Sequence, residues 1–224
     1  MLLDLPYINI NTCDILTGLT PLCAAAKSGD KRIVEILLER KVSVSQRNVC
    51  DQAPLHLGAR HGNIQVVDLL LQSGALVDQE DGHGRTPLMF AAIDMQLDVV
   101  RLLVKRKATL DKSDEAGMTA LAHAIISSNK DIVRFLLDSG ANGAKVDSFG
   151  RSPLDIAIFQ GNTDMVEILL EKDVPIEKED CRGIKPIDRA IALGNVDIVT
   201  TLIRLGSHLG PAAWAMAEGK PEIL

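Results

Sequence analysis

Apolar and polar positions along this chain recur with a fixed period of 33 residues. The segment TPLCAAAKSG (20–29) aligns without a gap with five later segments, which are APLHLGARHG, TPLMFAAIDM, TALAHAIISS, SPLDIAIFQG and KPIDRAIALG. A second set of columns follows in step, with an apolar pair such as Ile33-Val34 and a leucine such as Leu37 in every repeat. Apolar residues at this spacing form one face of a helix. Each repeat is therefore predicted to contain a short Ala-rich helix, a turn and a longer Leu-rich helix.

The turn positions of the repeat carry further structural signals. A proline after Thr or Ser suits the first turn of a helix, because the backbone N–H groups there have no hydrogen-bond partner within the helix. Glycine closes the first helix in most repeats, but Met95 and Ser128 replace it. After the second helix, Lys41, Lys107 and Asp173 stand where glycine is expected. We expect these five residues to adopt a strained left-handed backbone.

A 33-residue unit with the pattern T-P-L-x-x-A resembles the ankyrin repeat, and the resemblance covers about residues 10–224. It implies an all-α ankyrin-repeat solenoid, in which antiparallel helix pairs stack and β-turn fingers project from them. One repeat cannot bury its apolar faces alone, so the array is expected to fold as one domain. We expect six repeats over residues 16–209, preceded over residues 1–15 by the tail of an earlier repeat or an N-terminal cap. The chain is thus expected to be a piece of a longer protein.

The stretch GPAAWAMAEGKPEIL (210–224) keeps the internal register of the repeat but not its spacing. Pro211 follows Pro186 by 25 residues instead of 33, and the eight missing residues are those of the link and finger. The stretch is therefore predicted to be a truncated seventh repeat that caps the array. Trp214, the only tryptophan, is expected to pack on the sixth repeat.

Composition and charge exclude several classes of function. The net charge is −6 and no block of basic residues is present, so nucleic acid is not an expected partner. No apolar run is long enough for a membrane span or a signal peptide. The four cysteines are scattered, which favours a reducing compartment over a disulfide framework or a zinc site. We expect no metal and no cofactor.

The chain offers no constellation of catalytic residues. The residues Cys23, His56, Asp155 and Asp188 share one column of the repeat, where a polar side chain usually bonds local backbone. We therefore interpret them as braces of the turn, not as a nucleophile or a pair of acid–base carboxylates. The domain is not expected to be an enzyme.

The ankyrin resemblance implies that partners meet the finger tips and the exposed end of each first helix. In those columns, successive repeats place Ile93, Ile126 and Phe159 where polar residues are usual. Neighbouring apolar and basic positions complete a candidate partner-binding set of Arg60, Arg85, Ile93, Met118, Ile126, Phe149, Arg151, Phe159, Arg182 and Ile184. An apolar strip with a basic rim suits a peptide that carries apolar anchors and acidic residues. The alternative is that these side chains pack between repeats.

The C-terminal segments GIKPIDRAIALGN (183–195) and LGSHLGPAAWAMAEGKPEIL (205–224) resemble the TANC/Rolling pebbles scaffold family over roughly 40 residues. That resemblance implies a cytoplasmic adaptor beneath the plasma membrane, at synapses or sites of myoblast fusion, with an NTPase-like region before the array and tetratricopeptide (TPR) repeats after it. It also implies a link between adhesion receptors and cytoskeletal regulators. We expect a monomeric array that binds a protein or peptide, such as a receptor tail. Two alternatives remain: an autoinhibitory domain of an NTPase-containing protein, and an ankyrin-type inhibitor of transcription factors.

Overall fold

The computed structural model describes residues 10–16 and 18–210, and within them it contains twelve helices and no strand. The first helices of the six pairs are α1 (Pro21–Ser28), α3 (Pro54–Arg60), α5 (Pro87–Ile93), α7 (Ala120–Ile126), α9 (Pro153–Phe159) and α11 (Pro186–Leu193). The second helices are α2 (Lys31–Glu39), α4 (Ile64–Gln72), α6 (Leu97–Lys105), α8 (Lys130–Asp138), α10 (Thr163–Glu171) and α12 (Val196–Arg204). The predicted all-α fold is confirmed.

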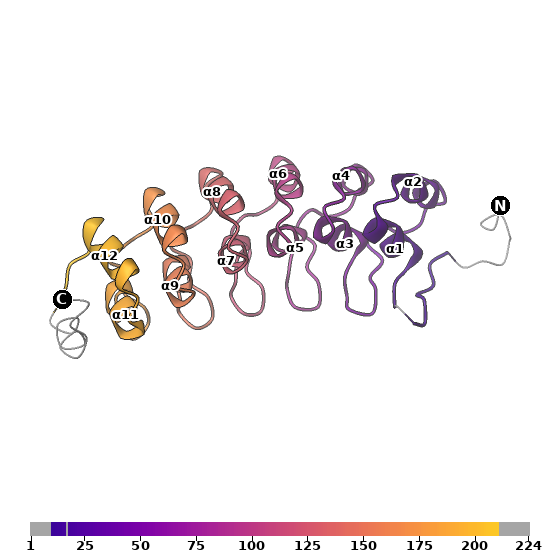
Figure 1. Ribbon diagram of the computed structural model, residues 1–224. Helices are drawn as coiled ribbons and strands as arrows, with labels where there is room; N and C mark the ends of the chain where they lie inside the picture. The colour runs from indigo at the N-terminus through magenta and orange to yellow at the C-terminus, as the bar shows by residue number, and fades with distance from the viewer. Residues whose placement is uncertain (1–9, 17, 211–224) are drawn as a thin grey trace. The chain divides into compact units, whose positions relative to one another are not determined.

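The helices form two compact units, the first ending at Glu115 and the second starting at Ala116. In unit 1, α1, α3 and α5 pack side by side, and α2, α4 and α6 form a second row above them in Figure 1. Unit 2 repeats this arrangement, with α7, α9 and α11 in one row and α8, α10 and α12 in the other. In each unit, the hairpin loops between pairs project beyond the first helices as fingers.

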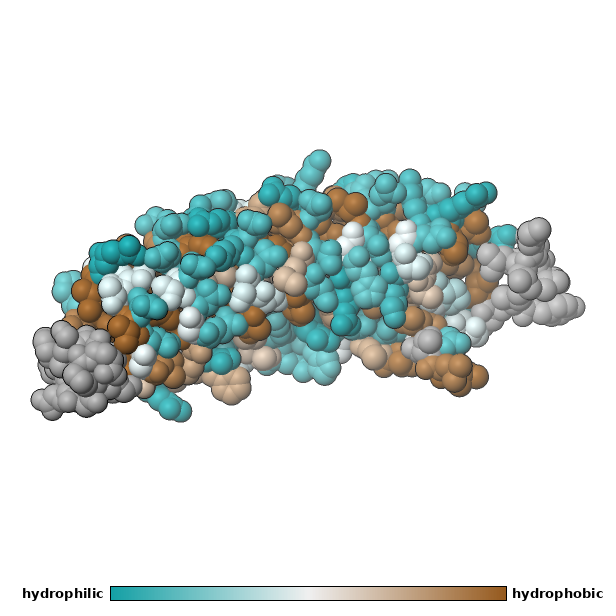
Figure 2. Space-filling model, viewed as in Figure 1, coloured by the Kyte–Doolittle hydropathy of each residue, from teal (hydrophilic) through white to brown (hydrophobic). Residues whose placement is uncertain are grey.

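The core of each unit is built from the apolar columns of the repeat. One leucine near the start of five of the six first helices is almost fully buried, as in Leu22, Leu55 and Leu154, and Ile187 takes this place in α11. The alanine column of these helices is buried as well, which lets neighbouring helices approach closely. Burying each such leucine contributes about 2 kcal/mol. Hydrophilic residues cover most of the row of second helices of unit 1 on the face shown in Figure 2.

A side-chain cap explains why Thr or Ser precedes the first helix in four of the six repeats. The Thr20 hydroxyl accepts a hydrogen bond from the Cys23 N–H at 3.1 Å, and Ser152 does the same for Asp155. This side-chain cap satisfies a backbone donor that has no partner inside the helix. Proline in the first turn costs no hydrogen bond, because a backbone N–H at that position would have no acceptor within the helix.

All five expected left-handed residues adopt that conformation. Their φ values are 59° at Lys41, 59° at Met95, 67° at Lys107, 54° at Ser128 and 57° at Asp173. A further case, Asp51 with φ of 60°, was missed; it occupies a finger position where the other repeats carry glycine. Each costs about 1 kcal/mol relative to a residue that tolerates the conformation.

The truncated seventh repeat was predicted over residues 210–224, and all of it except Gly210, Trp214 included, lies outside the described residues. Most of the predicted N-terminal tail lies outside them too. None of the described helices is long and apolar enough to cross a membrane.

Candidate functional site

An aspartate or asparagine at the base of a finger holds that finger in place. In unit 2, Asp147 Oδ1 accepts hydrogen bonds from the backbone N–H groups of Phe149 and Arg151, both at 2.9 Å. The same pair of bonds recurs in three further fingers, at Asn48, Asp81 and Asp180. The finger tips are therefore fixed before any partner arrives. This role was missed, although the 33-residue period alone could have revealed the column.

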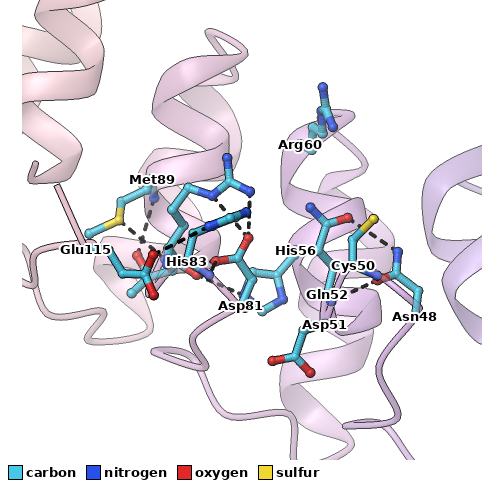
Figure 3. Close-up of polar contacts among 12 residues, drawn as sticks. Asn48, Cys50, Asp51, Gln52, His56, Arg60, Asp81, His83, Met89 and Glu115 are labelled. Atoms are coloured by element: carbon cyan, nitrogen blue, oxygen red, sulfur yellow. Dashed lines mark hydrogen bonds and ion pairs between the residues drawn. The ribbon is translucent and has the colours of Figure 1, made fainter.

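His56 braces its turn as predicted. Its Nδ1 accepts from the Ala53 N–H at 3.0 Å, and its Nε2 donates to the carbonyl of Gln79 at 2.8 Å. Figure 3 shows the imidazole directly beside the finger that carries Asp81. Burial of the ring lowers the pKa of His56, because the charged form is the more costly one to desolvate. The ring is therefore a neutral structural link between helix and finger.

The carboxylates of the same column also brace their turns. Asp155 Oδ2 accepts from the Ser152 N–H at 2.9 Å and from its hydroxyl at 2.8 Å. Asp188 Oδ2 accepts from the Lys185 N–H at 3.3 Å. The interpretation of these residues as turn braces is therefore confirmed.

A groove of about 260 Å³ in unit 2 brings together five of the ten predicted binding residues. It lies beside the fingers before α9 and α11, with Phe159 at the end of α9 and Arg189 in the first half of α11. Its lining consists of Phe149, Arg151, Phe159, Asp180, Arg182, Ile184 and Arg189. We call this the aromatic groove.

Two aromatic rings dominate the aromatic groove. The Phe149 side chain is 70% exposed and Phe159 is 46% exposed, while Ile184 is half-buried. Side chains that packed only between repeats would be buried, so core packing does not account for the two rings. Exposed aromatic side chains at a concave site are typical of partner contacts.

An arginine contacts each ring, and an ion pair holds each arginine in place. The Arg151 guanidinium carbon lies 5.0 Å from the Phe149 ring centre, and its Nε donates to Asp147 at 2.7 Å. Arg189 lies 4.8 Å from the Phe159 ring centre in the same way. Cation–π contacts of this kind fix ring orientation and add about 1 kcal/mol each.

Arg189 is the main site residue that sequence reasoning did not select. Its Nε donates to Asp155 at 2.9 Å and its Nη2 to Asp180 at 2.6 Å, and only 12% of its side chain is exposed. Burial opposes ionisation of Asp180, but bonds from the backbone N–H groups of Ile184 and Arg182 and from Arg189 outweigh it and lower its pKa. The charges of Arg151 and Arg189 are therefore already neutralised within the groove.

Arg182 differs from these two arginines. It is exposed at the finger tip, and no carboxylate of the described residues forms an ion pair with its guanidinium. Of the three groove arginines, it is the one available to an acidic group of a partner.

The remaining predicted residues lie outside the aromatic groove. Ile126 is 46% exposed at the end of α7 in unit 2. Met118 requires a correction: its side chain is only 6% exposed, because it packs into the core just before the cap of α7, so it presents no surface to a partner.

Three predicted residues belong to unit 1. Arg85 is held by Asp81 through two bonds of 3.1 and 2.8 Å and lies 4.7 Å from the Phe90 ring centre. Ile93 is half-buried at the end of α5. Arg60 is exposed at the end of α3, with its Nε 3.4 Å from Asp94 Oδ2.

Comparisons with known proteins agree with this architecture. The family model "Ankyrin repeats (3 copies)" matches residues 2–81, 75–147 and 140–211. Among solved structures, the chain is similar to the ankyrin repeat domain of Bcl-3, described as a unique member of the IkappaB protein family, at 28% identity and a TM-score of 0.80. That match covers 86% of this chain and 88% of the other. A search of curated proteins gives no match, and the resemblance to the TANC/Rolling pebbles family finds no support in these comparisons. The chain belongs to the ankyrin repeat family, whose repeats are protein-binding modules.

Proposed function

We propose that unit 2 captures a peptide segment of a partner protein in the aromatic groove. The observation that carries this proposal is the pair of exposed rings, Phe149 and Phe159, which arginine–carboxylate pairs fix in place beside Ile184. An apolar anchor of the peptide enters between the rings, and an acidic residue next to it pairs with Arg182.

The energetics favour an anchor of this type. Apolar area removed from water contributes about 25 cal/mol per Å², and buried aromatic contacts supply most of the binding energy at many interfaces. The rings are held before binding by Arg151 and Arg189, so little side-chain entropy is lost when a peptide enters. Arg182 supplies selectivity for acidic peptides more than affinity, because exposed ion pairs contribute less than about 1 kcal/mol.

The wider role we propose is that of a cytoplasmic adaptor. The domain would act as a monomeric module of a scaffold under the plasma membrane, with the peptide supplied by a receptor tail and the scaffold linking adhesion receptors to cytoskeletal regulators. This rests on the resemblance of residues 183–195 and 205–224 to the TANC/Rolling pebbles family.

The test is a binding measurement with matched variants. Partner proteins are first isolated with the full chain, and the peptide segment that binds is identified by truncation of each partner. The affinity of that peptide for the chain is then measured by calorimetry. We expect Phe159→Asp to weaken binding at least about tenfold, and Ile126→Asp with Phe159→Asp to abolish it, while helical content stays unchanged. Ile203→Asp on α12 is the control, because Ile203 is 43% exposed but lies outside the groove.

Two results would contradict the proposal. The first is full affinity in Phe159→Asp. The second is an equal loss of folding and binding in that variant, measured by circular dichroism and calorimetry. That result would mean that the Phe159 ring packs between repeats and does not contact a partner.

A second candidate is an inhibitor of transcription factors, favoured by the similarity to the ankyrin domain of Bcl-3, a member of the IkappaB family. Nuclear localisation of the intact protein would support it. The third alternative, masking of an NTPase region, predicts faster nucleotide turnover when the array is deleted from the full-length protein.

A further inference from the structure

A second groove lies in unit 1, at the ends of α1 and α3 and beside the finger at residues 48–52. Its volume is about 300 Å³, and it is lined by Leu19, Lys27, Asn48, Gln52, Leu57, Arg60 and His61. Three of these residues carry basic groups and none is acidic, although the whole chain has a net charge of −6. We call this the basic groove.

The basic side chains of this groove come from equivalent places in two successive repeats. Lys27 and Arg60 are separated by one period of 33 residues, and His61 follows Arg60 directly. All three are exposed. Basic residues at helix ends offset the helix dipole, but that role does not require them to line a common groove.

Little within the protein neutralises these charges. No described carboxylate pairs with Lys27, and the contact of Arg60 Nε with Asp94 is 3.4 Å long between partly exposed side chains. Arg85, by comparison, makes two shorter bonds to one buried carboxylate. Lys27 and Arg60 therefore remain available to an external anion.

The finger adds a fixed hydrogen-bond donor. Gln52 is only 8% exposed, and its Oε1 accepts from Asn48 Nδ2 at 3.4 Å, while no described residue accepts from its Nε2. Asn48 is itself held by the backbone N–H groups of Cys50 and Gln52. In Figure 3 the Gln52 amide extends from the finger on the same side as Arg60.

We infer that the basic groove binds an acidic peptide segment of a partner protein. Carboxylates of the segment pair with Lys27 and Arg60 and accept hydrogen bonds from Gln52 and His61, while an apolar side chain rests on the half-buried Leu19. The inference is independent of the aromatic groove, because it uses other residues in another unit.

The experiment uses the full chain and a fluorescein-labelled, glutamate-rich peptide with one central leucine. Binding is followed by fluorescence anisotropy at low and moderate salt. We expect Lys27→Gln and Arg60→Gln each to weaken binding about threefold, and Lys27→Glu with Arg60→Glu at least about tenfold. The neutral variants keep the test valid if the charge-reversed pair is unstable.

The matched control is Lys105→Glu with Lys107→Glu, which makes the same change of net charge on exposed residues of unit 1 away from the groove. We expect it to change the affinity less than about twofold. Phe159→Asp should leave this peptide unaffected, which separates failure of this inference from failure of the aromatic groove.

Three outcomes would overturn the inference. These are equal binding of the same peptide with glutamine in place of glutamate, an equal loss in the Lys105/Lys107 control, and equally effective competition by single-stranded DNA. The last two would show a general response to polyanions.

Discussion

The Arg189 guanidinium carbon lies 4.8 Å from the centre of the Phe159 ring. The same guanidinium bridges Asp155 and Asp180, two carboxylates whose side chains are 2% and 8% exposed. One side chain of α11 thus joins the cap of α9, the base of the last finger and the wall of the aromatic groove.

Replacing Arg189 with alanine should destabilise unit 2 by about 3 kcal/mol, because it leaves two nearly buried carboxylates without their cation. Urea unfolding followed by circular dichroism measures this loss. Arg182→Ala is the control, since its exposed side chain forms no ion pair within the described residues and should change stability by less than about 0.5 kcal/mol. Similar stabilities for the two variants would contradict the bridging role.

The stability of the chain should depend on the protonation of His56. Its pKa is lowered in the folded state by burial, so the native protein binds the proton less tightly than the unfolded chain, whose pKa stays near 6.5. The free energy of unfolding should therefore fall as the pH drops below about 6.5, by at most about 1.4 kcal/mol per pH unit for one proton.

The check on His56 is a series of urea titrations between pH 8 and pH 5. His56→Asn should be less stable than the parent at pH 8, because it loses part of the bonding to Ala53 and Gln79. Its stability should also fall less steeply with acid. A slope equal to that of the parent would assign the acid sensitivity to other groups.

Glu177 should affect the free energy of unfolding at lower pH than His56 does. Burial opposes its ionisation, but bonds from Lys185, Ser207 and the His208 N–H outweigh this and lower the pKa of Glu177 from 4.5 to about 2. Its stabilising effect is present above pH 4.5 and is lost as the pH falls toward 2. Glu177→Gln should be less stable at pH 6 and converge with the parent near pH 2, as measured by thermal melting across that range.

The left-handed residue after α6 offers a stabilising substitution. Lys107 holds a φ of 67°, and the equivalent position in two neighbouring repeats is glycine, at Gly74 and Gly140. Lys107→Gly should raise the free energy of unfolding by up to about 1 kcal/mol, because glycine adopts this backbone without steric cost. Arg101→Gly, in the middle of α6, is the control and should lower it by about 1 kcal/mol. A loss of stability in Lys107→Gly would show that the lysine side chain outweighs the strain.

The 33-residue columns were enough to predict the helices and five of the six left-handed non-glycine residues among the described ones, because each depends on residues close in sequence. Column position alone did not settle burial: Met118 and Arg151 share a column, yet Met118 packs into the core while Arg151 reaches the groove and pairs with Asp147. A long apolar side chain at that place turns inward, and a charged one turns toward a carboxylate.

The role of Arg189 was missed because it depends on contacts between repeats. Arg189 bonds to Asp155, 34 residues away, and only the packed helices bring the two together. The division into two units at residues 115 and 116 also has no sequence signal, because the repeat period continues unbroken across it.

The hydrogen bonds from Asp147 and Asp180 to backbone N–H groups have a consequence for how such a domain can change its partners. Those bonds shape the finger through main-chain atoms alone, so they place no demand on the identity of the side chain at the tip. Phe149 and Arg182 occupy equivalent tips in successive repeats and differ completely in chemistry. Substitution of a single tip residue can therefore change which partner a finger binds. The aspartate at the base of that finger keeps the loop conformation unchanged.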